Sequence, residues 1–268
     1  MGIVNVTPDS FSDGGNFFHP DTAIAHGLAL AAAGAAVIDV GGESTRPGAE
    51  PVEVDEELRR VLPVVRGIAA QVRVPVSIDT TKAAVARAAL DAGAQMVNDV
   101  SGGAADPDML ESVAAAGAAY VAMHMRGTPR TMQQEARYTD VVRDVGDELR
   151  ARVTNATDAG IDARALLADP GIGFAKTAEQ NVALLRALPD IAARVGVPLL
   201  VGVSRKSFLA RIVGGDDRAG RDDATLATTV WCFGQGAALV RVHDVAASRR
   251  AVALLETLER ATPEGMAA

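Results

Sequence analysis

Residues 199–208 read LLVGVSRKSF, an apolar run that ends abruptly in hydroxyls and two cations. Unbroken Leu and Val suit a strand that is covered on both faces, as in a parallel sheet. Lys206 and Ser207 then begin a helix pattern, and the free N–H groups of a helix start together with the Lys206 charge favour an anion. The alternative is a solvated Ser-Arg-Lys turn without a function. Residues at the other strand ends help to decide between an anion-binding site and such a turn.

Similar units recur along the whole chain. Short β-branched runs are expected as strands at 2–6, 36–40, 76–79, 96–100, 120–123, 166–169, 199–203 and 239–242. Helix patterns lie between them at 22–33, 55–71, 82–92, 107–116, 140–159, 178–194, 222–236 and 246–260, and Gly follows several of them as a C-terminal stop. Eight βα units in one uninterrupted chain predict an α/β protein with a single (β/α)8 TIM barrel, with an open doubly wound sheet as the alternative.

Composition excludes several classes of protein. The 268 residues carry a formal net charge of -8, which disfavours nucleic acid and anionic membrane as partners. Cys232 is the single cysteine, so no internal disulfide framework is possible and a reducing, cytoplasmic location is expected. No signal peptide or membrane-spanning run is indicated.

Polar or ionisable residues close nearly every expected strand. Barrels of this kind place their chemistry where strands end and βα loops begin. Such residues are Asn5, Asp39, Asp79, Asn98, Asp99, His124, Asp169, Ser204, Lys206, Arg241 and His243. Any one of them can simply cap a strand, but buried polar groups are costly without partners, so their joint occurrence favours a ligand with many hydrogen-bonding edges.

The residue types narrow that ligand further. Asp79, Asn98 and Asp169 suit a flat heterocycle with adjacent N–H donors on one edge, and Lys206 suits acceptors on the other edge. Arg46, Arg241 and His243, with Asn5, form a cationic group fit for phosphate. Transition-metal motifs are absent from the sequence, whereas Mg2+ bridging a phosphate ligand through Asn5 remains open.

Several blocks resemble the bacterial dihydropteroate synthases, which are pterin-binding TIM-barrel enzymes. They are residues 5–15 (NVTPDSFSDGG), 39–48 (DVGGESTRPG), 77–80 (SIDT), 98–102 (NDVSG), 123–129 (MHMRGTP), 169–174 (DPGIGF), 204–207 (SRKS) and 241–244 (RVHD). The resemblance runs from about residue 2 to 260 in the same motif order. It implies a transferase of folate biosynthesis that joins 6-hydroxymethyl-7,8-dihydropterin diphosphate to p-aminobenzoate, giving 7,8-dihydropteroate and diphosphate.

The resemblance also implies roles for individual residues. Catalytic residues would be Lys206, Asp79, Asp169, Arg241 and Asp13. The pterin would contact Asp79, Asn98, Met123, Asp169, Phe174, Gly202 and Lys206. The diphosphate would contact Asn5, Thr45, Arg46, Arg241 and His243, with Asn5 as the protein ligand of Mg2+. The p-aminobenzoate would contact Phe11, Thr45, Pro47, Phe174, Lys206 and Ser207.

Other properties follow from the same resemblance. Family chemistry is an SN1-like displacement under two long, mobile first and second βα loops that close as lids. A barrel domain over 1–261, a disordered tail over 262–268, a homodimer and sensitivity to sulfonamides as competitors of p-aminobenzoate are expected. Residues 50–60 are interpreted as a solvated helix entrance and 214–221 as a polar loop without chemistry.

Three rival functions remain. A pterin-dependent methyltransferase would need Asp79, Asn98 and Asp169 but not the segments at 11–13 and 241–243, which are present. A non-catalytic pterin-binding relative would lack a lid or diphosphate residue, and none is missing. A synthase that excludes sulfonamides would depart from the ordinary drug-sensitive pattern, and no departure is seen at Phe11, Thr45, Arg46, Pro47 or 171–176.

Overall fold

The computed structural model describes residues 1–7, 20–46, 48–214 and 217–260. Eight parallel strands alternate with helices: β1 (Gly2–Asn5), β2 (Ile38–Gly41), β3 (Val76–Asp79), β4 (Met96–Asp99), β5 (Ala119–Met123), β6 (Leu166–Asp169), β7 (Leu200–Gly202) and β8 (Leu239–Arg241). The helices are α1 (Pro20–Ala32), α2 (Val54–Ala69), α3 (Ala83–Asp91), α4 (Met109–Ala116), α5 (Val141–Asp158), α6 (Ala178–Arg186), α7 (Leu188–Val195), α8 (Ser207–Val213), α9 (Arg218–Gly234) and α10 (Val245–Arg260). Short 3-10 helices lie at η2 (Met132–Glu135) and η3 (Ala163–Ala165).

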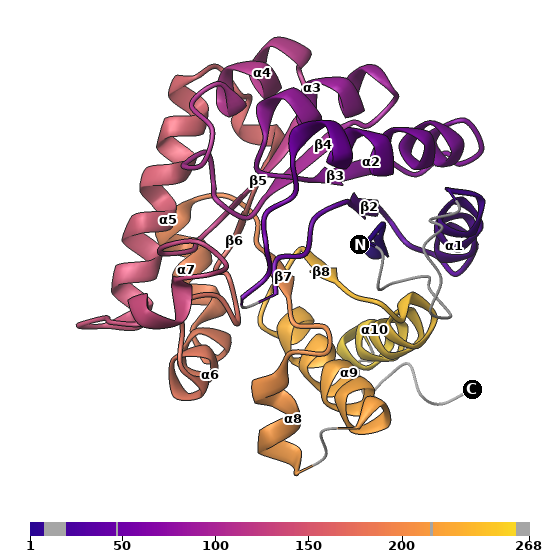
Figure 1. The fold of residues 1–268 in the computed structure, drawn as a ribbon. Helices are drawn as coiled ribbons and strands as arrows, with labels where there is room; N and C mark the ends of the chain where they lie inside the picture. Colours follow the sequence, from indigo (N-terminus) through magenta and orange to yellow (C-terminus); the bar gives the residue numbers. More distant parts are fainter. Residues whose placement is uncertain (8–19, 47, 215–216, 261–268) are drawn as a thin grey trace.

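The strands close into a barrel at two seams. Strands β1 to β6 form one continuous ladder, and β7 pairs with β8. Single parallel bridges join Ala168 to Leu199 and Gly2 to Val242, so the pair β7–β8 fills the gap between β6 and β1. The Ile3 N–H donates to the Val242 carbonyl at 3.1 Å across the second seam. The predicted (β/α)8 barrel is therefore confirmed, with the helices around the strands (Figure 1).

Two layers of apolar side chains build the core. The large cluster lies between the strands and the helices, which bury residues such as Ile38, Ile78 and Leu184. A smaller cluster contains Met1, Val37, Met96, Val121 and Leu200. Side chains alternate along a strand, so the residues two positions after Met96, Val121 and Leu200 point to the same side as these do. That side is the barrel interior, which places Asn98, Met123 and Gly202 above the smaller cluster.

The single helix predicted over 178–194 is wrong, because two helices occupy this stretch. The first ends at Arg186, and Ala187 has φ -106° and ψ 19° before the second begins. Pro189 stands in the first turn of α7, where its missing N–H costs nothing, whereas inside a continuous helix it breaks a hydrogen bond.

Two further interpretations need correction. The stretch 214–221 is not entirely loop, since α9 begins at Arg218 and the Asp217 side chain caps it by accepting the Gly220 N–H at 2.8 Å. The stretch 50–60 is not simply solvated, because Glu57 is fully buried. The expected tail, 262–268, lies outside the described residues, and within the described helices none is long and apolar enough to span a membrane.

Candidate active site at the carboxyl ends of the strands

Four neighbouring strands bring residues at their carboxyl ends to one level. The ladder pairs Asn5 with Gly41, Gly41 with Asp79, and Asp79 with Asn98. Farther round the barrel, Met123 pairs with Asp169, and Gly202 pairs with Arg241. The predicted pterin-contacting residues of the strands therefore share one end of the barrel, as the βα topology requires.

Arg241 links two buried carboxylates at the barrel mouth. Its Nε donates to Asp39 Oδ2 at 2.6 Å and one terminal nitrogen donates to Asp79 Oδ2 at 2.8 Å. The Asn98 amide donates to the same Asp39 oxygen at 3.1 Å. Asp39 is fully buried, and its Oδ1 has no hydrogen-bond partner among the described residues. Among the described residues these contacts use two of the five guanidinium N–H groups, which leaves three for a ligand.

Burial sets the protonation of Asp79. Desolvation raises its pKa to about 7, against the lowering effect of Arg241, with Asp39 adding to the rise. Arg241 itself has a raised pKa, because the attraction of Asp39 and Asp79 outweighs the burial that lowers it. The mouth thus combines a permanent cation with a carboxyl group that changes charge near neutral pH.

Asp169 and Lys206 form the opposite wall. The Asp169 Oδ1 accepts the Gly171 N–H at 2.7 Å, and the Lys206 Nζ lies 4.2 Å from the centre of the Phe174 ring. Burial raises the pKa of Asp169 to about 6, while Gly171 and Lys206 lower it. Burial also lowers the pKa of Lys206 to about 8, opposed by Asp169. This wall supplies an acceptor, a donor and an aromatic face.

Small residues keep the space between these groups open. A Cβ on Gly173 would lie 3.0 Å from the Lys206 Cδ, and one on Gly202 would lie 3.6 Å from Asp169 Oδ2. Met123 and Phe174 are buried in one apolar cluster beside this space. The arrangement fits a flat ring that is contacted at its edges by polar groups and on its faces by apolar ones.

His243 stands beside Ser204 at the ends of β8 and β7. The Ser204 hydroxyl accepts the His243 backbone N–H at 3.1 Å and contacts Nδ1 at 2.8 Å. Burial, together with the charges of Arg205, Arg241 and Arg46, lowers the pKa of His243 to about 3. His243 is therefore neutral at pH 7. When the Ser204 hydroxyl donates to Nδ1, Nε2 carries the ring proton and is a donor.

A buried lysine supports the loop that carries Phe174. The Lys176 Nζ contacts the Gly171 carbonyl at 3.0 Å, the Phe174 carbonyl at 2.8 Å and His124 Nδ1 at 3.1 Å. His124 Nε2 in turn contacts Glu148 at 2.9 Å. These acceptors, with the His124 carbonyl as a fourth at 3.5 Å, satisfy the three donors of an ammonium group, although burial lowers the pKa of Lys176 to about 7. Sequence reasoning included Lys176 only in the drug-sensitive pattern over 171–176 and gave it no structural role.

The remaining predicted site residues that the structure describes are less buried. Asn5 and Thr45 are partly buried, and Arg46 and Ser207 are exposed. The Ser207 hydroxyl begins the short α8 and accepts from Arg211 at 3.5 Å. The predicted contacts Phe11, Asp13 and Pro47 lie outside the described residues.

The protein oxygens at the barrel mouth suit Mg2+ only when a bound phosphate group supplies most of its coordination. Groups of three or more His, Cys, Asp or Glu side chains able to hold a metal do not occur in the described ranges. The orphaned Asp39 Oδ1 and the Asn5 side chain are oxygen donors near the level of Asp79. Mg2+ accepts one or two protein oxygens with waters and phosphate, so these residues fit it in that mode.

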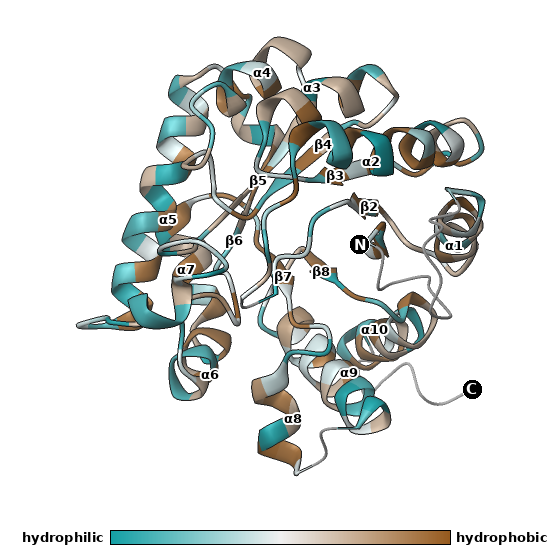
Figure 2. Ribbon diagram, viewed as in Figure 1, coloured by the Kyte–Doolittle hydropathy of each residue, from teal (hydrophilic) through white to brown (hydrophobic). Residues whose placement is uncertain are grey.

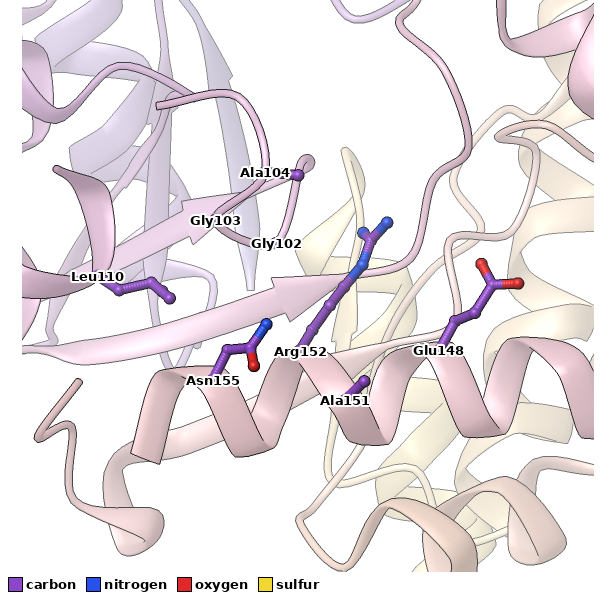
Figure 3. Close-up of a pocket in the computed structure, with 8 residues that line it drawn as sticks. All are labelled: Gly102, Gly103, Ala104, Leu110, Glu148, Ala151, Arg152 and Asn155. Carbon is purple, nitrogen blue, oxygen red and sulfur yellow. The ribbon is translucent and has the colours of Figure 1, made fainter. Parts of the chain in front are cut away.

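A pocket of about 310 Å³ lies between the segment that follows β4 and helix α5. Its lining, drawn in Figure 3, is Gly102, Gly103, Ala104, Leu110, Glu148, Ala151, Arg152 and Asn155. Arg152 rises from α5 (Figure 3), and its guanidinium donates to the Met125 carbonyl at 2.6 Å and to the Met123 carbonyl. The pocket thus flanks the barrel, and Arg152 supports the end of β5 from outside.

Comparison with known proteins agrees with this geometry. The family model described as "Pterin binding enzyme" matches residues 1–243. A dihydropteroate synthase of Mycobacterium leprae is 51% identical over 270 residues, covering 98% of this chain and 94% of that protein.

Solved structures give the same picture. Dihydropteroate synthase of Xanthomonas albilineans with 4-aminobenzoic acid has a TM-score of 0.91 at 46% identity, covering 97% of this chain and 93% of that one. The Yersinia pestis enzyme in complex with a sulfonamide drug has a TM-score of 0.90 at 41% identity, covering 97% and 94%. The chain belongs to the pterin-binding enzyme family, among its dihydropteroate synthases.

Proposed function

We propose that the inward-facing strand ends catalyse the condensation of 6-hydroxymethyl-7,8-dihydropterin diphosphate with p-aminobenzoate to 7,8-dihydropteroate. One observation carries the assignment of residues: Arg241 binds Asp39 and Asp79 on one side of the barrel mouth, facing Asp169, Lys206 and Phe174 on the other. Membership in the dihydropteroate synthases supports the reaction.

In this proposal Asp79 and Asn98 accept pterin N–H groups from one side of the barrel mouth, and Asp169 accepts them from the other side. Lys206, beside Asp169, donates to pterin acceptors, and Met123, Phe174 and Gly202 contact the ring. Carboxyl groups with pKa values near 6 and 7 serve well here, because a bound N–H donor favours the charged acceptor and lowers those values again.

Arg241, His243, Asn5, Thr45 and Arg46 hold the diphosphate. The free N–H groups of Arg241 and the Nε2 of neutral His243 donate to its oxygens, and Arg46 adds charge from the second βα loop. Mg2+, held mainly by the diphosphate and assisted by Asn5, would supply further charge neutralisation for the leaving group.

The displacement is SN1-like. The bond between the pterin methylene carbon and the diphosphate oxygen breaks first, and its electron pair leaves with the diphosphate. Pterin nitrogen electrons then stabilise the cation, and the p-aminobenzoate nitrogen forms the new C–N bond before losing a proton to solvent or diphosphate. Arg241 stabilises charge on the departing oxygen, and the βα loops exclude water from the cation.

The p-aminobenzoate lies at the mouth, against Thr45, Phe174, Lys206 and Ser207, with Phe11, Asp13 and Pro47 contributing from outside the described residues. The Xanthomonas albilineans structure with 4-aminobenzoic acid supports this substrate, and the Yersinia pestis complex supports sulfonamides as competitors. Sulfonamide inhibition that p-aminobenzoate fails to relieve contradicts this part of the proposal.

A homodimer through the helices around α8 is proposed as well. Ile212 and Val213 are 60% and 57% exposed, and Trp231 on α9 is 47% exposed. Figure 2 shows the apolar colour on α8 at the outside of the barrel. Exposed apolar residues on two helices that pack against each other suit a subunit interface. An Ile212→Glu variant that keeps the wild-type mass in light scattering argues against this interface.

A cytoplasmic location completes the proposal. The lone Cys232 is buried, and burial raises its pKa to about 12, so it is an inert core thiol that suits a reducing compartment.

The test is diphosphate release with dihydropterin diphosphate and Mg2+, with and without p-aminobenzoate. Release that depends on p-aminobenzoate and yields dihydropteroate is expected. Lys206→Met should abolish most of it, whereas the matched control Arg218→Met, at a side chain that is 81% exposed, should not. Tight pterin binding without condensation would favour the non-catalytic alternative.

A further inference from the structure

The second βα loop is tied together at its base by Glu43. The Glu43 Oε2 accepts the Val52 N–H at 3.1 Å and also contacts the Lys82 ammonium. Residues 43 and 52 lie on opposite sides of the loop, so one carboxylate oxygen joins its two ends. We call Glu43, Val52, Lys82 and Glu57 the loop neck.

Lys82 connects this loop to two helices. It precedes α3, and its ammonium contacts both Glu43 and Glu57 of α2. Glu57 is fully buried, which is costly for a carboxylate without a cation. Burial lowers the pKa of Lys82, but hydrogen bonds to Glu43 and Glu57 outweigh it and raise the pKa above its ordinary value. The lysine therefore stays charged across the physiological range.

The backbone next to the loop neck is also fixed, by a hydrogen bond and by close packing. Arg60 donates to the Gly42 carbonyl at 2.9 Å, and a Cβ on Gly42 would lie 2.7 Å from Val61. At the far side of the loop the Gly48 N–H donates to the Pro129 carbonyl at 3.1 Å. Thr45 and Arg46 thus sit between two fixed points.

We infer that Glu43 and Lys82 are positioning residues, which hold the second βα loop so that Thr45 and Arg46 face the diphosphate and p-aminobenzoate. The inference rests on the proposed function of those two loop residues. Neither Glu43 nor Lys82 needs to touch substrate. Their effect reaches the reaction through the path of the chain between residues 43 and 52.

Glu43→Ala is the cleanest test, because Lys82 keeps Glu57 and no buried charge is stranded. The probes are 6-hydroxymethyl-7,8-dihydropterin, which lacks the diphosphate, for calorimetric binding, and p-aminobenzoate for steady-state kinetics. We expect the KM for p-aminobenzoate to rise about tenfold and kcat to fall, since a charge-assisted tie is lost. Pterin binding should stay within about twofold, because the barrel mouth is untouched. Glu43→Gln keeps an acceptor oxygen and should restore most of the activity.

Three outcomes overturn the inference. One is a Glu43→Ala variant whose KM and kcat match the wild type while Arg46→Gln is impaired. The second is a loss of pterin binding and melting temperature in step with activity, which indicates a general structural defect. The third is normal activity in both Glu43→Ala and Arg46→Gln, which also removes Arg46 from the proposed function.

Discussion

Replacing Arg241 with Met should strand two carboxylates inside the barrel mouth. Asp39 is fully buried and Asp79 nearly so, and one guanidinium serves both. Removing one partner of a buried ion pair costs about 3–5 kcal/mol. For a chain of this size each kcal/mol lowers the melting temperature by about 2–4 °C, so a fall of about 6–20 °C is expected at pH 8.

The loss of stability in Arg241→Met should grow as the pH rises. In the wild type the pKa of Asp79 is already raised to about 7 by burial, against Arg241. Removing that cation raises the pKa of Asp79 further. A carboxyl whose folded pKa exceeds its unfolded value contributes stability below about pH 4, and this is lost as pH rises through the folded pKa. The variant should therefore be closest to the wild type at about pH 5 and furthest from it at pH 8.

Thermal unfolding at these two pH values measures the effect. Arg218→Met serves as the control for loss of a cation, and the double variant Asp39→Asn, Arg241→Met should recover part of the loss because one stranded charge is removed. A melting temperature for Arg241→Met within about 2 °C of the wild type at pH 8 would refute the reasoning. So would a deficit that grows as the pH falls.

Other predictions concern the opposite wall and its support. Lys206→Met should weaken calorimetric binding of 6-hydroxymethyl-7,8-dihydropterin about 10- to 100-fold, and unchanged binding would remove Lys206 from the pterin edge. Binding of the same pterin should weaken as pH falls through about 6, where Asp169 takes up a proton and loses acceptor capacity, and Asp169→Asn should flatten this part of the profile. Lys176→Met leaves the Phe174 carbonyl without its donor and the Gly171 carbonyl with only the Phe174 N–H, so a cost of about 2 kcal/mol in denaturant unfolding is expected. Wild-type stability in that variant contradicts the supporting role of Lys176.

Strand positions followed closely from the sequence because strand ends carry clear signals. The observed bounds of β3 and β6 match those predicted, since each apolar run stops at an aspartate. The break between α6 and α7 escaped prediction because Leu184, Leu188 and Ile191 keep helical spacing across it. Pro189 was the signal that mattered there, since periodicity alone does not register a missing N–H.

The site was predictable to the extent that topology alone gathers it. The (β/α)8 topology places the carboxyl ends of all strands at one end of the barrel. It therefore brings Asp79, Asn98 and Asp169 together, whatever the side-chain packing. The contact between Lys82 and Glu43 joins distant parts of the sequence and follows no periodic pattern. Only the folded structure reveals it. Glu57 did leave a signal: together with Val61, Val64 and Ile68 it occupies one face of α2, where a buried carboxylate calls for a partner.

The two single-bridge seams have a consequence for local opening of the barrel. Asp79, Asn98 and Asp169 belong to the six-strand ladder, whereas Gly202 and Arg241 belong to β7–β8. Amides at Ala168 and Val242 should exchange with deuterium sooner than those inside the ladder, since each seam has few hydrogen bonds to hold it. A pterin that contacts both parts binds only the closed seam, so it should slow exchange at these amides.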